Sequence, residues 1–181
     1  MKLFNPIKFL LGLFAVILIR LIQMPLPNFE PIMGAMLPFA KKYGRLAGFI
    51  FASLALASFD LISGRLGMWT LYCALTYGLI GIAAGKYFGA EKRRRMKYYL
   101  GFGAIGTVFY DAATALVFGW QFGQPLEMTI LGQIPFTIYH LMGSTAFILV
   151  LTPLVNNYIV ENPMLELNLM GEPARNNYHY K

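Results

Sequence analysis

The sequence predicts an all-α membrane protein in which six helices cross the bilayer. Of its 181 residues, 57% are hydrophobic and 13% are charged, whereas soluble domains carry roughly 25% charged residues. Thirteen of the fifteen Lys and Arg residues fall in four basic clusters between apolar segments: residues 2–8, 41–45, 86–97 and 175–181. Because basic loops stay in the cytoplasm, we expect a multi-pass protein of the plasma membrane with both termini cytoplasmic.

Six apolar segments supply the expected helices, since a helix needs about 20 apolar residues to cross a bilayer. They are residues 7–23, 32–40, 46–62, 68–88, 98–118 and 134–159. Proline and glycine mark the breaks between them, beginning with Pro25 and Pro27 after the first segment. We therefore expect one membrane domain over residues 1–160 and a polar, loosely ordered cytoplasmic tail over residues 161–181.

The second segment differs from the others because it is too short to cross a membrane alone and contains Pro38. Irregular backbone at membrane depth is tolerated only where protein or a cavity surrounds it. We therefore expect a short, bent helix that packs inside the protein.

Composition and motifs exclude several classes of function. The net charge of +7 favours the lipid bilayer over nucleic acid as a partner, because the basic run at residues 91–95 lies between two membrane segments. The single Cys73 excludes an intramolecular disulfide and a cysteine-only metal site. No phosphate-binding loop, zinc motif or nucleophile elbow occurs in the sequence. We expect a protein that is not an enzyme, with no catalytic residues, metal or cofactor.

Four titratable residues are expected at one depth in the outer half of the membrane. A rise of 1.5 Å per residue places Arg20, Asp60 and Asp111 about 20 Å from the inner surface of a roughly 30 Å core. Counted from the outer side, His140 lies about 10 Å deep. Charged groups at such depths normally face the bundle interior. They either pair, as Arg20 with Asp60 or Asp111, or form the polar floor of an outward-facing pocket.

Other residue types in the same segments support two further hypotheses. Aromatic residues at this depth, including Tyr110 and Tyr139, suit a flat solute. Small residues at helical spacing, such as Gly48 and Ala52, let helices approach closely. These small residues either pack helices within the chain or dock a partner helix.

Three stretches resemble the substrate-binding S component of energy-coupling factor (ECF) vitamin transporters. Residues 27–31 (PNFEP) resemble the start of that family's short second helix. Residues 43–48 (YGRLAG) and 59–64 (FDLISG) resemble the two ends of its third helix. Residues 77–85 (YGLIGIAAG) resemble its glycine-rich fourth helix. The resemblance extends over about residues 5–160.

The resemblance implies a role in vitamin uptake. An S component binds a vitamin-like small molecule in an outward-facing pocket, which the loop between the first two helices gates. It then topples on a transmembrane T component, and two ATPase subunits drive release. The expected substrate-binding residues are Arg20, Asn28, Glu30, Asp60, Tyr110, Asp111, Tyr139 and His140. The expected docking residues are Gly12, Ala15, Gly48 and Ala52, although Gly12 and Ala15 are three apart and depart from the family's Ala-x-x-x-Ala motif.

Two other classes of function remain open from the residues. In a stand-alone ion- or proton-coupled carrier, Asp111 and His140 would form a relay, because histidine titrates near neutral pH. A membrane structural or assembly subunit would use the faces of small residues and need no pocket.

Overall fold

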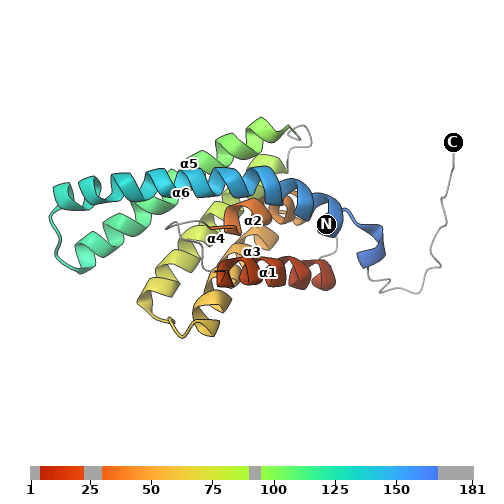
Figure 1. Cartoon of the computed structure of the whole chain (residues 1–181), viewed down its shortest axis with the longest axis horizontal. Helices are drawn as coiled ribbons and strands as arrows, with labels where there is room; N and C mark the ends of the chain where they lie inside the picture. Colours follow the sequence, from red (N-terminus) through yellow and green to blue (C-terminus); the bar gives the residue numbers. More distant parts are fainter. Residues whose placement is uncertain (1–4, 23–29, 90–94, 167–181) are drawn as a thin grey trace.

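The computed structural model describes residues 5–22, 30–89 and 95–166 as an all-α protein (Figure 1). The described helices are α1 (Pro6–Leu21), α2 (Ile32–Tyr43), α3 (Arg45–Ile62), α4 (Met68–Phe88), α5 (Met96–Gln121) and α6 (Leu126–Val155). A π-helical turn (Asn156–Val160) and a 3-10 turn (Pro163–Leu165) follow α6. Helices α3, α4, α5 and α6 with its π turn are long and apolar enough to cross a membrane.

The helix α2 lies at the centre of the bundle, and every residue over 32–40 is buried. Pro38 has no N–H to bond the carbonyl of Gly34 four residues earlier. The hydroxyl of Thr152 in α6 donates a 2.8 Å hydrogen bond to that carbonyl instead. The structure thus confirms a short, buried second helix, in which α6 satisfies the carbonyl that Pro38 leaves free.

Glycine allows α3 and α4 to approach each other at backbone distance. A Cβ atom added to Gly48 would overlap the carbonyl oxygen of Gly81, and one added to Gly81 would overlap the backbone of Gly48. Such contacts between small residues are a common way to pack helices in lipid. The small residues of these two helices therefore serve packing within the chain.

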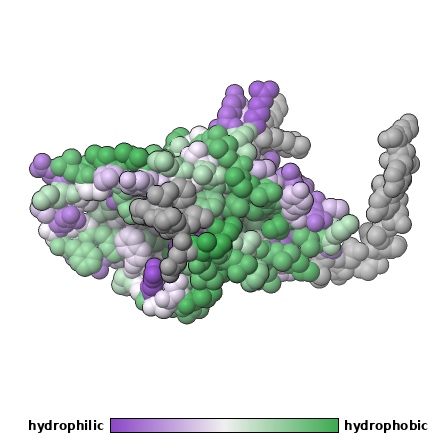
Figure 2. Space-filling model, viewed as in Figure 1, coloured by the Kyte–Doolittle hydropathy of each residue, from purple (hydrophilic) through white to green (hydrophobic). Residues whose placement is uncertain are grey.

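Large apolar side chains form stripes on the outer faces of the helices. The exposed residues recur at four-residue spacing: Leu10, Phe14 and Leu18; Leu71, Leu75 and Leu79; Ile130, Ile134 and Ile138. In Figure 2, hydrophobic surface covers much of the visible face, and hydrophilic patches lie at the left end, at the top and at the lower edge. A soluble monomer rarely exposes so much apolar surface, whereas lipid solvates it.

The first turns of α6 differ from the sequence-based expectation. The helix begins at Leu126 rather than at residue 134, and its N-cap is Pro125. Hydropathy does not detect this start, because the first turns contain polar residues such as Glu127 and Gln133. At 30 residues, α6 is about 45 Å long, so its ends extend beyond a hydrocarbon core of roughly 30 Å. His140 is therefore the fifteenth residue of the helix, not about the seventh.

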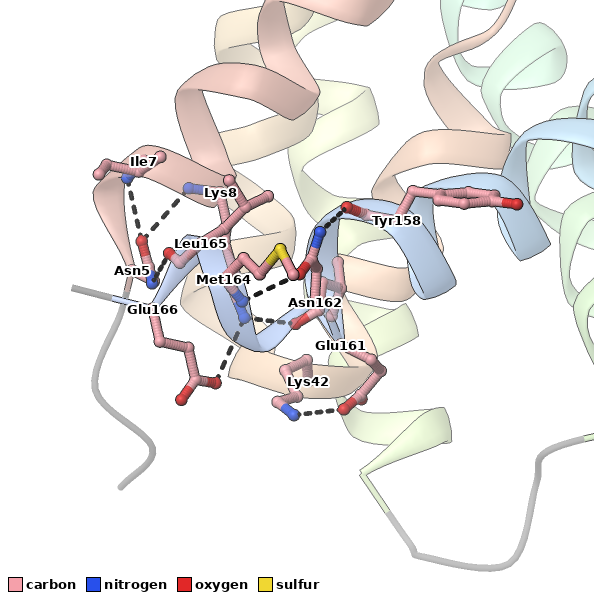
Figure 3. A network of polar contacts seen from close by, with 11 residues as sticks. Asn5, Ile7, Lys8, Lys42, Tyr158, Glu161, Asn162, Met164, Leu165 and Glu166 are labelled. Carbon is pink, nitrogen blue, oxygen red and sulfur yellow. Dashed lines mark hydrogen bonds and ion pairs between the residues drawn. The ribbon is translucent and has the colours of Figure 1, made fainter. Parts of the chain in front are cut away.

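The beginning of the expected tail packs against the start of α1 (Figure 3). Lys8 is fully buried, and its Nζ atom donates to the carbonyl of Val160 at 2.9 Å and lies 3.3 Å from a carboxylate oxygen of Glu166. The Asn5 side chain caps α1 and donates a 2.8 Å hydrogen bond to the carbonyl of Leu165. We call these contacts the C-terminal clasp. The tail after Glu166 lies outside the described residues.

Candidate binding cavity

A cavity of about 400 Å³ lies at the end of the bundle where α1, α3 and α5 finish and α2, α4 and α6 begin. This end is opposite the described basic residues Lys41, Lys42, Arg45, Lys86, Arg95 and Lys97. Cavities that hold small molecules commonly have volumes of about 300–1,000 Å³. The volume and the mixture of aromatic and polar lining are therefore suited to a small solute.

An ion pair between Arg20 of α1 and Glu30, which precedes the N-cap residue of α2, forms one wall. The Nη2 atom of Arg20 lies 3.0 Å from Oε1 of Glu30, and the guanidinium lies 4.1 Å from the ring centroid of Phe59. The other polar atoms, Nη1 of Arg20 and Oε2 of Glu30, are buried without a hydrogen-bond partner among the described residues. Buried polar groups are strongly driven to find partners. This wall can therefore offer both a donor and an acceptor to a solute.

A buried polar chain closes the cavity floor. His140 of α6 and Asp111 of α5 are almost fully buried, and Nδ1 of His140 lies 2.7 Å from Oδ1 of Asp111. The hydroxyl of Tyr77 in α4 lies 3.3 Å from Nε2 of the same ring. An imidazole protonated at Nδ1 donates to Asp111 and accepts from Tyr77. The chain thus fixes the orientation of His140, whose ring lines the cavity.

Asp60 has a structural partner as well as a place in the lining. The hydroxyl of Thr70 donates a 2.6 Å hydrogen bond to Oδ2 of Asp60, and the same oxygen of Thr70 accepts from the N–H of Gly67 at 3.3 Å. These bonds connect the end of α3 to the first turn of α4. Asp60 therefore holds the α3–α4 connection and also presents a carboxylate at the cavity.

Aromatic rings form the less polar walls. Trp69 and Phe118, which line the cavity, have ring centroids 4.1 Å apart. Tyr110 also lines the cavity, and the fully buried Tyr77 packs behind it with a centroid distance of 4.2 Å. Phe136 lies edge-on to His140 at 6.3 Å. Such rings offer flat faces to a planar solute.

The structure brings together most of the expected substrate-binding residues. Five of the eight line the cavity: Arg20, Glu30, Asp60, Tyr110 and His140. Asp111 lies behind His140, whereas Tyr139 is 42% exposed and is not part of the lining. Asn28 lies outside the described residues, as does the rest of residues 23–29 in the expected gate.

The ion pairs differ from those expected from the sequence. Arg20 pairs with Glu30 rather than with Asp60 or Asp111, and Asp111 pairs with His140. The reason is that Glu30 lies next to Pro31, the N-cap of α2, where its side chain meets Arg20 in the last turn of α1.

Sequence reasoning missed the contribution of the first turns of α6. Thr129, Gly132, Gln133 and Phe136 line the cavity together with His140. Their spacing of three and four residues places them on one face of a helix. The signal that could have revealed this face is Pro125 followed by Glu127, because proline and acidic residues favour a helix start.

Three of the four expected docking residues, Gly12, Gly48 and Ala52, are buried against the chain's own helices. A Cβ on Gly12 would overlap the Phe39 ring, and Gly48 packs on Gly81. Ala52 is fully buried, and Ala15 is half-buried. In this arrangement they leave little free surface for another subunit, so their role in docking stays a prediction.

The geometry of the cavity allows a small solute to be bound and oriented. Within the described residues, no group of three or more His, Cys, Asp and Glu side chains could hold a metal ion. Comparison of the chain with models of protein families, with curated proteins and with solved structures gives no match.

Proposed function

We propose that the protein captures a vitamin-like small solute as the S component of an ECF-type importer. The observation that carries this proposal is the cavity of about 400 Å³ with the partly unpartnered Arg20–Glu30 pair in its wall. The stretches that carry the family resemblance support it further. Glu30 and Asp60 from two of them line the cavity, and Tyr77 from a third bonds His140.

In this proposal, the cavity binds its solute through two kinds of contact. The unpartnered Nη1 group of Arg20 donates to a carboxylate or carbonyl oxygen of the solute. The unpartnered Oε2 atom of Glu30 accepts from an amine or hydroxyl group of the solute. The Trp69–Phe118 pair packs on a planar ring. A solute with a flat ring and polar groups of both kinds fits these contacts. Binding through these contacts involves no covalent step.

Delivery requires other subunits in this proposal. The cavity lies at the end of the bundle opposite the described basic residues, which the positive-inside rule assigns to the cytoplasm. Movement of the whole subunit on a T component, driven by two ATPases, would carry the solute across. The basic end would then face the cytoplasm, and the cavity would face outward before docking.

A tagged pull-down from native membranes in mild detergent tests this proposal. Mass spectrometry should identify a small membrane subunit and two related ATPases. The Arg20→Gln variant is a matched control, since it alters the cavity and should leave the recovered subunits unchanged. Recovery of the protein alone, after mild crosslinking of the membranes, would contradict the proposal.

The Tyr77–His140–Asp111 chain favours a second candidate, a stand-alone proton-coupled carrier. Its three polar groups extend from the cavity into the buried interior and could pass a proton. Liposomes that contain only this protein should then show proton flux that Asp111→Asn abolishes. A lack of flux under any pH gradient would exclude this candidate.

A further inference from the structure

A second cavity, of about 480 Å³, lies at the basic end of the bundle. It is lined by the ends of α2, α4 and α6, the beginning of α5 and the π turn after α6. Its polar lining residues are Lys41, Lys42, Tyr99, Thr152, Asn156, Asn157 and the single acidic residue Glu161. None of these residues belongs to the solute cavity, so this cavity calls for its own explanation.

Lys41 brings a positive charge without a carboxylate partner among the described residues. Its Nζ atom donates a 2.9 Å hydrogen bond to the hydroxyl of Tyr99 and lies 5.6 Å from the centre of the same ring. This contact includes no carboxylate, so nothing in it compensates the positive charge of Lys41. The Tyr99 hydroxyl accepts this bond, and its own proton is available for an acceptor in the cavity.

Lys42 has a partner that an anion could displace. Its Nζ atom lies 2.7 Å from Oε2 of Glu161, and the Glu161 side chain is 52% exposed. Ion pairs at exposed positions contribute little to stability. Glu161 therefore restrains Lys42 only weakly, and its carboxylate would compete with any anion that enters the cavity.

The start of α5 adds to the positive potential. Met96, its first residue, lines the cavity, and the first turn of α5 has neither an acidic residue nor a side-chain cap. Unpaired N–H groups and the helix dipole at such a start favour anions. The described cations at this end are Lys8, Lys41, Lys42, Arg45, Lys86, Arg95 and Lys97, and the described acids there are Glu161 and Glu166.

The π turn completes the lining with amide groups. Asn156 Nδ2 donates to Oδ1 of Asn157 at 3.1 Å, which leaves the Nδ2 group of Asn157 to donate elsewhere. Short π-helical turns occur frequently at functional sites. The cavity thus offers four donor groups, namely two ammonium groups, a phenol and an amide, against one carboxylate, that of Glu161, which is paired with Lys42.

We propose that this cavity binds the phosphate group of an anionic ligand. Lys41 and Lys42 supply the charge, and Tyr99 and Asn157 supply further hydrogen bonds. Basic pockets between membrane helices on the cytoplasmic side bind phospholipid head groups, and a soluble phosphate offers the same chemistry. This site does not depend on the solute cavity or on the proposed importer.

Two binding assays on the purified full-length protein in neutral detergent distinguish these sources. Native mass spectrometry counts adducts of phosphatidylglycerol, with phosphatidylcholine as the reference lipid. A thermal-unfolding titration with inorganic phosphate, with chloride at equal ionic strength as the reference, measures the soluble source. A head-group site predicts phosphatidylglycerol adducts, and a soluble-phosphate site predicts stabilisation by phosphate.

Four variants connect either result to the cavity. Lys41→Gln and Lys42→Gln should each weaken binding by about tenfold, since each removes a charge-assisted hydrogen bond. Lys97→Gln is the matched control, because this exposed lysine lies at the same end outside the cavity lining. Glu161→Gln should strengthen binding severalfold because it frees Lys42.

Two results would overturn the site. One is that phosphatidylglycerol forms no more adducts than phosphatidylcholine, and phosphate stabilises the protein no more than chloride does. The other is equal weakening by Lys97→Gln and Lys42→Gln, which would indicate a diffuse surface attraction. If Lys41→Gln does not fold, the opposite effects expected for Lys42→Gln and Glu161→Gln still decide the question.

Discussion

The Nδ1 atom of His140 and the Oδ1 atom of Asp111 lie 2.7 Å apart in the interior of the bundle. Both side chains are at most 2% exposed, and the hydroxyl of Tyr77 contacts the other ring nitrogen. Removing one side chain of such a buried pair is costly, because the remaining polar group loses its partner. The pair therefore holds α5 to α6 and shapes the cavity floor.

We expect His140→Ala to lower the free energy of unfolding by about 3 kcal/mol, because it strands the Asp111 carboxylate in the interior. The double variant His140→Ala/Asp111→Asn should cost less than the sum of the two single changes. Reversible unfolding in mixed micelles measures all three variants. Additive effects would show that the two side chains are not coupled.

Gly81→Ala should destabilise the protein by about 1–3 kcal/mol, because the new Cβ atom must push α3 away from α4. Gly101→Ala in α5 is the matched control, since a Cβ atom there would meet open space. The control should be neutral or slightly stabilising, because alanine favours a helix. Equal effects on the melting temperature would contradict the close approach of Gly48 and Gly81.

Thr152→Val should cost about 1–2 kcal/mol, because it removes the donor that satisfies the carbonyl of Gly34. In a Pro38→Ala background the same change should cost less, since the N–H of Ala at this position can bond that carbonyl within α2. A double-mutant cycle on unfolding free energies measures the difference. An unchanged cost in the two backgrounds would show that Thr152 does not replace the bond that Pro38 removes.

Lys8→Met should release the C-terminal clasp, because it removes the donor to Val160 and the ion pair with Glu166. Amide hydrogen exchange over residues 161–166 should become faster, while exchange in α4 stays unchanged. Lys97→Met is the control for loss of a positive charge at the same end. Exchange that is equally slow in the two variants would show that the clasp does not depend on Lys8.

Hydropathy and proline were sufficient to predict the main features of the fold. Helix α2 was predicted as short and buried because Pro38 interrupts a segment too short to span a membrane. The start of α6 was not predicted, because its first turns contain the polar residues Glu127 and Gln133. Hydropathy does not distinguish such a polar helical turn from a loop.

The sequence indicated part of the cavity lining, namely its titratable residues, but few of the contacts that these residues make. Arg20, Asp60, Asp111 and His140 stand out because charge is costly inside a membrane. Their partners depend on helix rotation, which one sequence does not specify, so Glu30 was not recognised as the partner of Arg20. The clasp joins Lys8 to Val160 across 152 positions, and no local pattern indicates such a contact.

Ligand-dependent stabilisation of the wild-type protein tests the proposed solute capture most directly. A panel of vitamin-like solutes is screened by thermal unfolding in detergent against Arg20→Gln and the exposed-charge control Arg65→Gln. At a hundredfold excess over its dissociation constant, the correct solute should stabilise the wild type and the control by about 2.7 kcal/mol. Arg20→Gln should lose most of this stabilisation. Equal stabilisation of Arg20→Gln and the wild type, or no stabilisation by any solute in the panel, would contradict solute capture in this cavity.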